Sequence, residues 1–187
     1  GQLVREMAQR LGGGDLANVP AMLERLDRET VVALRRSYWK QMEAAHGAAL
    51  EGKVIDKLPL NCVHIPFINL VFPDARLLFA LRDPRDVCLS CFFQWFGLNE
   101  SMVQYLSMPD TARFYARVMD LWLHCREHTT LPYIEFRYED TVAGLEREAR
   151  RMLELMDLEW DPALLNFHEN ARQEEISTPS YVEVTQK

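Results

Sequence analysis

The sequence RLLFALRDPRDVCLSCFFQWF, residues 76–96, decides the fold that this chain is expected to adopt. Its apolar run 77–81 is short and continuous, which predicts a strand buried on both faces. Asp83 is a favourable N-cap residue, and Pro84 suits the first helical position because its missing N–H costs nothing there. Beyond them, apolar side chains recur at helical spacing and predict one apolar helix face: Val87, Cys88, Cys91, Phe92 and Trp95. The stretch therefore predicts a strand, a tight turn and a helix.

The end of this predicted strand is suited to an anion. In an open parallel sheet, ligands lie beyond the carboxyl ends of the strands, and helix N-termini favour negative charge. Arg82 stands at that strand end, and Ser90 follows on the helix stripe of Asp83 and Asp86. A guanidinium fork and a hydroxyl donor are suited to a phosphate group. Alternatively, Arg82 pairs only with Asp86, and Ser90 is an ordinary surface residue.

Strand-like and helix-like patterns alternate along the rest of the chain. Besides 77–81, strands are expected at 53–56 and 132–137, and a loop with a helical turn at 97–108. Helices are expected at 1–11, after Pro20, at 28–46 with Asp27 as cap, at 60–72 with a kink at Pro66, after caps at Asp110 and Asp140, and at 160–168. This alternation implies an α/β fold with a parallel sheet and right-handed crossovers.

The composition narrows the classes of partner. A chain of 187 residues has the length of one domain and enough apolar content for a core. Its formal net charge is −7 and it has no basic stripe, which argues against nucleic acid as a partner. An anionic ligand must therefore rely on local cations, of which Lys57 and Arg82 are the candidates. The most apolar stretch, 62–72, is interrupted by polar residues and is too short to span a bilayer, so no membrane partner is expected.

The cysteines and histidines give no pattern typical of a metal centre. Four cysteines and no secretory leader lead us to expect reduced thiols in a cytoplasmic protein. Cys88 and Cys91 form a C-x-x-C pair without a second pair at zinc spacing, which favours burial on a helix over metal or redox chemistry. No two histidines and a carboxylate occur at metal-ligand spacing, and His64, His124 and His168 are each expected to be structural. No metal is therefore expected.

Several motifs together resemble sulfotransferases that use 3′-phosphoadenosine 5′-phosphosulfate (PAPS). The sequence RDPRD at 82–86, with Ser90, resembles their signature for binding the 3′-phosphate. Its context, DKLPLN at 56–61 and RYED at 137–140, is similar to bacterial sulfotransferases often fused to tetratricopeptide repeats. More distantly, it resembles the tyrosylprotein sulfotransferases. The likeness runs from about residue 53 to the end of the chain.

The resemblance implies the sulfotransferase fold, which is a parallel sheet flanked by helices and similar to that of phosphate-loop NTPases. Members of the family begin this sheet with a strand and a glycine-containing loop, roughly PRSGTT, that binds the 5′-phosphosulfate end of the cofactor. Nothing in this sequence resembles that loop. We therefore expect residues 1–187 to form a single, partial sulfotransferase domain of a longer protein.

The resemblance also implies an activity and its residues. The sulfuryl group would pass from PAPS to a hydroxyl acceptor, a small molecule or peptide, leaving adenosine 3′,5′-bisphosphate and needing no metal. Lys57 matches a family lysine that contacts the transferring group, while Arg82, Ser90, Tyr138 and Ser180 match cofactor-binding positions. Ordinary roles stay open for Lys57, Tyr138 and Ser180, as a surface lysine, a core tyrosine and a loop serine.

The general base is not fixed by the sequence. The tyrosylprotein branch uses a glutamate in a Gly-Glu pair, whose nearest counterpart here is Gly1-Gln2. Glutamine cannot accept the proton of the acceptor hydroxyl. The base is then Glu6, a residue before Gly1, or absent.

Two other function classes compete with sulfuryl transfer. A non-catalytic module that binds a nucleotide or a partner on a sulfotransferase fold would also lack the phosphosulfate loop and the base. A small-molecule kinase with a phosphate loop lacks support, because no Gly-Lys-Ser/Thr element occurs. The acceptor and the oligomeric state are not indicated by the sequence.

Overall fold

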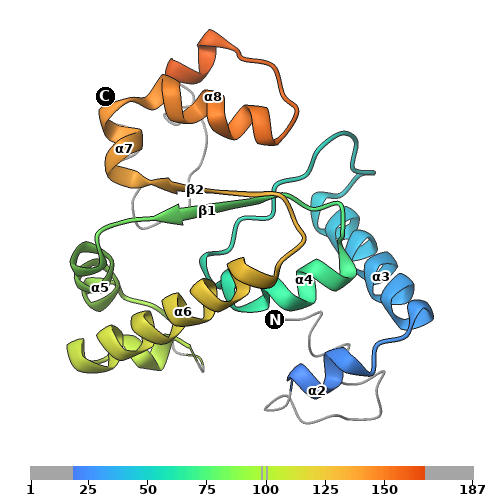
Figure 1. Cartoon of the computed structure of the whole chain (residues 1–187), viewed down its shortest axis with the longest axis horizontal. Coiled ribbons are helices and arrows are strands. Elements are labelled where there is room, and N and C mark those ends of the chain that lie inside the picture. The colour runs from blue at the N-terminus through green and yellow to red at the C-terminus, as the bar shows by residue number, and fades with distance from the viewer. Residues whose placement is uncertain (1–18, 98, 100, 167–187) are drawn as a thin grey trace. The chain divides into compact units, whose positions relative to one another are not determined.

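The computed structural model describes residues 19–97, 99 and 101–166 (Figure 1). The chain divides into two compact units. Residues up to 75 together with 121–131 form the first, which we call the helical unit. Residues 76–120 and those from 132 onward form the second, which we call the sheet unit. The helix predicted at 1–11 lies outside the described residues, and the single domain stays a prediction.

The longest helix of the helical unit is α3 (Arg28–His46), and it has the predicted bounds. Its N-cap Asp27 accepts a hydrogen bond from the backbone N–H of Thr30 at 2.8 Å. The helix ends at Gly47, whose φ of 79° lies in the left-handed region that favours glycine. Both ends are therefore set by residues that can be read from the sequence.

The core of the helical unit joins α3 to two short helices, α2 (Val19–Glu24) and α4 (Ile65–Val71). Its buried members come from all three: Met22, Leu34, Phe67 and Val71. In addition, the Arg35 guanidinium donates to the carbonyl oxygen of Val71 at 2.7 Å, which satisfies a backbone acceptor at the end of α4. Packing and this capping bond together hold α4 against α3.

The prediction of one kinked helix at 60–72 is wrong, because this segment forms two helices. The chain makes a 3₁₀ helix, η2 (Pro59–His64), and then α4 begins at Ile65. Pro66 is thus in the first turn of an α-helix, where its missing N–H costs no hydrogen bond. Proline starts the helix here instead of bending it.

The strand predicted at 53–56 is absent. The sheet of the described residues pairs β1 with β2 alone, and Ile55 is 70% exposed. The following Asp56 carboxylate accepts instead from the Tyr38 hydroxyl at 3.0 Å and from the Asn61 amide at 3.2 Å. Side-chain bonds to helices therefore hold this segment where a sheet ladder was expected.

The sheet unit contains two parallel strands, β1 (Leu77–Leu81) and β2 (Tyr133–Arg137), in place of the three that were expected in the chain. Leu77 lies opposite Tyr133, and Leu81 lies opposite Arg137. Parallel pairing and the strand at 132–137 are confirmed. Burial of β1 on both faces is wrong: Ala80 is exposed and the other four residues are only partly buried.

Helix α5 (Pro84–Phe93) follows β1 with the predicted cap, because Asp83 accepts from the backbone N–H of Arg85 at 2.9 Å. Its predicted apolar face is wrong in extent, since only Cys88 is buried. The helix ends at Phe93, so Trp95 lies beyond it and is fully exposed. A helix that ends early cannot carry the last residue of the predicted face.

Helix α6 (Met108–His128) begins two residues before Asp110, the predicted cap. Ser107 holds the capping position: its hydroxyl accepts from the N–H of Asp110 at 3.2 Å and donates to the Asp110 carboxylate. Asp110 is therefore the third helical residue, and its N–H receives the N-cap bond that begins the helix. The preceding 3₁₀ turn, η3 (Met102–Tyr105), confirms the loop with a helical turn.

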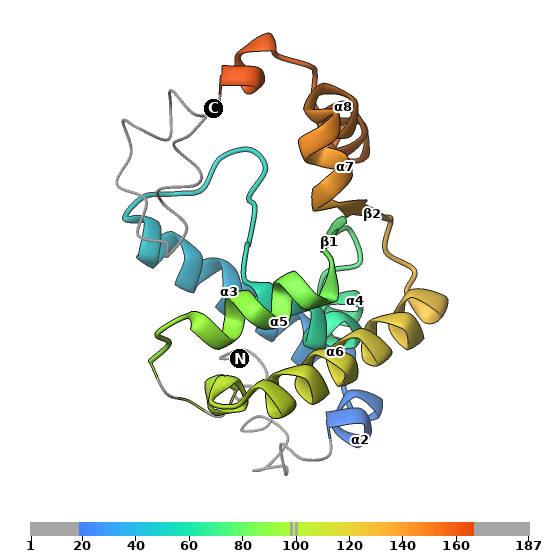
Figure 2. The same ribbon diagram turned by 90° about the vertical axis from the view of Figure 1, so that its left-hand side faces the viewer.

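The single helix predicted after Asp140 is divided in two. Asp140 lies inside α7 (Tyr138–Ala143), and α8 (Leu145–Leu155) follows after Gly144 (Figures 1 and 2). The N–H of Gly144 donates to the carbonyl oxygen of Asp140, which closes α7. The N-cap positions of the two helices are Arg137 and Gly144, so Asp140 is the cap of neither. The helix predicted from 160 is the 3₁₀ helix η4 (Pro162–Asn166).

Leu34→Ala should destabilise the protein strongly, because the Leu34 side chain is fully buried in the core of the helical unit. Removing a buried leucine leaves a cavity and costs about 2–5 kcal/mol of unfolding free energy. Urea denaturation of both chains measures the difference. Val32→Ala on the same helix is the control, since this side chain is 45% exposed. Equal losses in the two variants would contradict this core.

Candidate functional site

The strand register brings Arg82 and Tyr138 to one edge of the sheet. Leu81 and Arg137 are the last opposed pair, so the chain leaves the two parallel strands at Arg82 and at Tyr138. The Arg82 guanidinium carbon lies 4.7 Å from the centre of the Tyr138 ring, a cation–π arrangement. In Figure 1, α5 and α7 both begin at this end of the sheet. Two residues predicted to bind the cofactor are therefore in contact.

Arg82 also has an acidic neighbour on α5. Its guanidinium lies 3.5 Å from the Asp86 carboxylate, one helical turn later, so the predicted alternative pairing does form. The Arg82 side chain is nevertheless 41% exposed and that of Asp86 more so. An ion pair of this kind contributes about 0–1 kcal/mol, because water screens both charges. A more highly charged anion can therefore displace Asp86 at little cost.

Glu139 connects the ends of the two strands, and the sequence analysis did not single it out. Its carboxylate accepts from the backbone N–H of Asp83 at 2.8 Å, and its other oxygen lies 3.6 Å from the Arg137 guanidinium. The bond from Asp83 is the main cause of a lowered Glu139 pKa. The RYED motif contained the residue, but nothing in the pattern indicated that it spans to the other strand.

Asp83 is held between the helix that it caps and Arg85. Its carboxylate accepts from the Arg85 side chain at 2.7 and 3.0 Å, besides the capping bond from the Arg85 N–H. The Arg85 side-chain bonds are the largest cause of a pKa far below the usual range of an aspartate. Asp83 therefore stays ionised, and Arg85 is already committed to it. We call Arg82, Asp83, Asp86, Tyr138 and Glu139 the strand-end cluster.

The other predicted site residues are not brought to this cluster by any described interaction. Ser90 is exposed on α5, one turn beyond Asp86, and its hydroxyl forms no hydrogen bond to the described residues. Ser180 lies outside the described residues, as do Gln2 and Glu6. Lys57 is exposed and belongs to the helical unit. The roles of Lys57, Ser90 and Ser180 stay predictions.

The segment that carries Lys57 is fixed on both sides. Before it, Asp56 is bonded to Tyr38 and Asn61, and burial with this acid raises the pKa of Tyr38 to about 12. After it, Leu58 stands at the N-cap position of η2, in extended conformation. Lys57 therefore lies between a bonded residue and the start of a helix, and its side chain is exposed.

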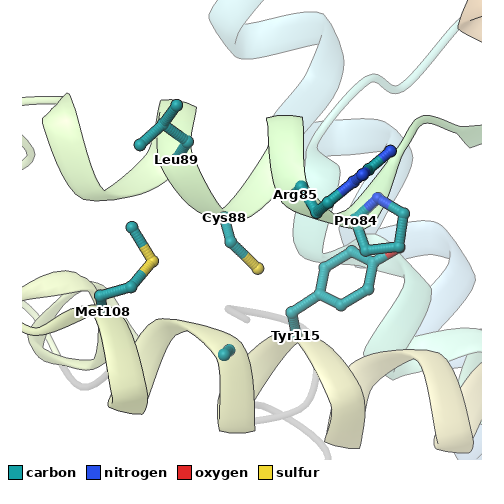
Figure 3. Close-up of a pocket in the computed structure, with 7 residues that line it drawn as sticks. Pro84, Arg85, Cys88, Leu89, Met108 and Tyr115 are labelled. Atoms are coloured by element: carbon teal, nitrogen blue, oxygen red, sulfur yellow. The ribbon is translucent and has the colours of Figure 1, made fainter.

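An open cavity of about 510 Å³ lies between α5 and α6 (Figure 3). Its lining is mostly apolar: Pro84, Arg85, Cys88, Leu89, Met108, Ala112 and Tyr115. Cys88 and Tyr115 project into this space from the two helices, and burial raises the pKa of both groups. Because Cys88 is two residues from both Asp86 and Ser90, it lies on a different side of α5, so the cavity is not on the face predicted to meet the cofactor.

The sequence matches the model of one protein family over most of its length. A model described as the sulfotransferase family matches residues 6–162, which include the strand-end cluster and Lys57. The chain belongs to the sulfotransferase family. The match supports sulfuryl transfer in general, and it leaves open the donor and the acceptor.

The chain is also similar to an uncharacterized protein of Aquifex aeolicus (strain VF5), with 24% identity over 126 residues. The aligned part covers 64% of the chain but only 16% of that relative, so the chain spans a small part of the protein that it matches. No solved structure matches it. The likeness to repeat-associated or tyrosylprotein sulfotransferases stays a prediction.

The described residues contain neither a larger metal-binding group nor a helix that could span a membrane. They hold no group of three or more His, Cys, Asp or Glu side chains placed to bind one metal ion. Within the same residues, no helix combines the length and the apolar character needed to cross a membrane.

The bond between Glu139 and Asp83 predicts a measurable pH dependence. Because the folded pKa of Glu139 lies below its ordinary value of 4.5, its stabilisation is complete above pH 4.5. It is lost as the pH falls through the lower, folded value. An NMR titration of the Asp83 amide should show a transition with a midpoint below 4.5.

Glu139→Gln is the matched control for this titration. Its amide oxygen can still accept the Asp83 N–H but does not titrate in this range. The transition should vanish in this variant, which leaves only any titration of Asp83 itself. A transition midpoint at pH 4.5 or above in the unchanged protein would contradict the hydrogen bond from the Asp83 N–H to Glu139.

Proposed function

We propose that this sulfotransferase moves the sulfuryl group from PAPS to a hydroxyl acceptor, with Arg82 binding the ribose-side 3′-phosphate of the nucleotide. The observation that carries the proposal is the guanidinium of Arg82, held against Tyr138 at the carboxyl ends of two parallel strands. This edge is where open α/β sheets place their ligands. The planar fork of an arginine can donate two parallel hydrogen bonds to phosphate oxygens.

The cluster favours a phosphate over its present acidic neighbour. Asp86 lies 3.5 Å from the guanidinium and offers one negative charge in an exposed pair. A phosphate monoester carries nearly two charges near neutral pH and three acceptor oxygens. Exchanging Asp86 for the phosphate therefore gains charge-assisted bonds and gives up only a screened pair. Ser90, one turn beyond Asp86, adds a hydroxyl donor in this proposal.

Tyr138 has two parts in the proposed complex. Its ring already packs against one side of the guanidinium and limits the orientations that the fork can take. The same side chain is half-exposed, so its remaining ring surface and its hydroxyl can meet the nucleotide. Ser180 is proposed as a further cofactor contact on the resemblance alone.

The chemical step is a transfer between two oxygens. The acceptor oxygen forms a bond to sulfur, the bond from sulfur to the bridging phosphate oxygen breaks, and the acceptor's proton passes to a base. Negative charge grows on the bridging oxygen, which a lysine ammonium can neutralise in a site that excludes water. We assign this part to Lys57 on the resemblance; for the base, the three alternatives given above stay open. No metal enters the proposal.

The nucleotide pocket is tested by calorimetry on the full-length protein. Adenosine 3′,5′-bisphosphate should bind more tightly than adenosine 5′-phosphate, because only the first has a phosphate for Arg82. Arg82→Ala should weaken binding of the bisphosphate by about 1.5–3 kcal/mol and leave the monophosphate almost unchanged. Arg113→Ala on α6 is the control, since its guanidinium pairs with Asp110. Equal affinity for the two nucleotides would remove PAPS as the donor.

Lys57→Ala should abolish transfer of labelled sulfate from PAPS while nucleotide affinity stays close to that of the unchanged protein. A role only in the transition state lowers kcat without weakening ground-state binding. Lys40→Ala, on an exposed position of α3, is the matched control and should keep full turnover. Tight nucleotide binding without transfer in the unchanged protein would favour the non-catalytic module instead.

A further inference from the structure

The last turns of α6 carry a pair of histidines that neither the family nor the proposed reaction uses. His124 and His128 are one helical turn apart, and their ring centres lie 4.6 Å from each other at an interplanar angle of 34°. A structural role was expected for His124, and the spacing to His128 was not considered. Both side chains are exposed, while Trp122 and Cys125 on another side of the helix are buried.

One hydrogen bond fixes which nitrogen of His128 can bind a metal. Its Nδ1 lies 2.9 Å from the backbone carbonyl oxygen of His124. A carbonyl oxygen only accepts, so Nδ1 carries the proton in the neutral ring and Nε2 keeps its lone pair. Histidines that bind metals commonly donate their other ring nitrogen to a backbone carbonyl in this way. The ring of His124 forms no hydrogen bond to the described residues, so none of these residues occupies its nitrogens.

The surroundings of the pair lower the cost of binding a cation. Directly after α6, the Thr129 hydroxyl and the Thr130 N–H both donate to the Asn69 side-chain oxygen, at 2.8 and 2.9 Å. Leu131 is buried, so the chain is anchored on the far side of the histidines as well. The carbonyl end of a helix carries partial negative charge, which favours a cation near its last turn. The backbone that carries the two histidines is therefore already ordered before a metal ion binds.

We propose that His124 and His128 bind one divalent transition-metal ion, of the class of nickel, cobalt or zinc, with water completing its coordination. Bonds of about 2.0–2.1 Å from each nitrogen require the two nitrogens to lie roughly 3 Å apart. Rings that already face each other reach this spacing by rotating their side chains. Imidazole nitrogen selects these ions over magnesium, calcium and manganese. This site is independent of sulfuryl transfer.

Calorimetric titration of NiCl₂ into the full-length protein tests the site. We expect one ion per chain, release by a chelator, and affinities that fall from nickel to cobalt to manganese. His124→Gln and His128→Gln should each lower nickel affinity at least about tenfold. Loss of a residue that only hydrogen-bonds to a metal ligand already lowers metal affinity by about this factor, and loss of a ligand should cost no less. His46→Gln is the matched control: His46 is exposed at the end of α3 and has no histidine one turn before it.

A second readout needs no variant. Paramagnetic Co²⁺ should broaden the ring-proton NMR signals of two histidines first, and these should be the two signals that the variants at 124 and 128 remove. Nickel affinity unchanged in both variants would overturn the proposal. Equal affinity for manganese and nickel, or broadening that begins at other histidines, would do the same.

Discussion

The parallel pairing of β1 with β2 is the constraint on which the candidate site depends. Because Leu81 lies opposite Arg137, the two chains leave the sheet side by side, and the next residues are Arg82 and Tyr138. A register slipped by one residue would turn each side chain to the other face of its strand. The guanidinium and the ring then could not meet at 4.7 Å. One backbone ladder therefore sets the position of two side chains that are 56 residues apart in the sequence.

Side chains extend this ladder beyond the last strand pair. Glu139 accepts from the Asp83 N–H, so the turn after β1 is tied to the start of α7. Asp83 in turn caps α5 and holds Arg85. The backbone N–H that an N-cap residue itself exposes is thus satisfied from the neighbouring strand end instead of from within its own helix. The start of α5 is fixed by its own cap and by the second strand together.

Two of the four predicted helix caps were correct, and the parallel sheet was expected, but particular side-chain contacts between distant segments were not. The caps at Asp27 and Asp83 act within three residues of themselves, so their helices begin as predicted. A strand needs a partner elsewhere in the chain, which residues 53–56 lack among those described. Trp95 fitted the spacing of a helix that ends before reaching it. Arg82 and Tyr138 were predicted as separate positions by resemblance, whereas the bond from Asp83 to Glu139 has no sequence pattern.

Net charge is a poor guide to where this acidic chain can hold an anion. Three arginines at the sheet edge, Arg82, Arg85 and Arg137, each pair with an acid. The acids differ in how firmly they hold their partners. Arg85 makes two side-chain bonds of 3.0 Å or less to Asp83, while Arg82 reaches Asp86 only at 3.5 Å. Arg137 lies at a similar 3.6 Å from Glu139, but that carboxylate is also engaged by the Asp83 N–H. Of the three arginines, Arg82 has a weakly held acid and also packs against the Tyr138 ring. A phosphate at this edge can therefore displace the acid of Arg82 more easily than that of Arg85 or Arg137.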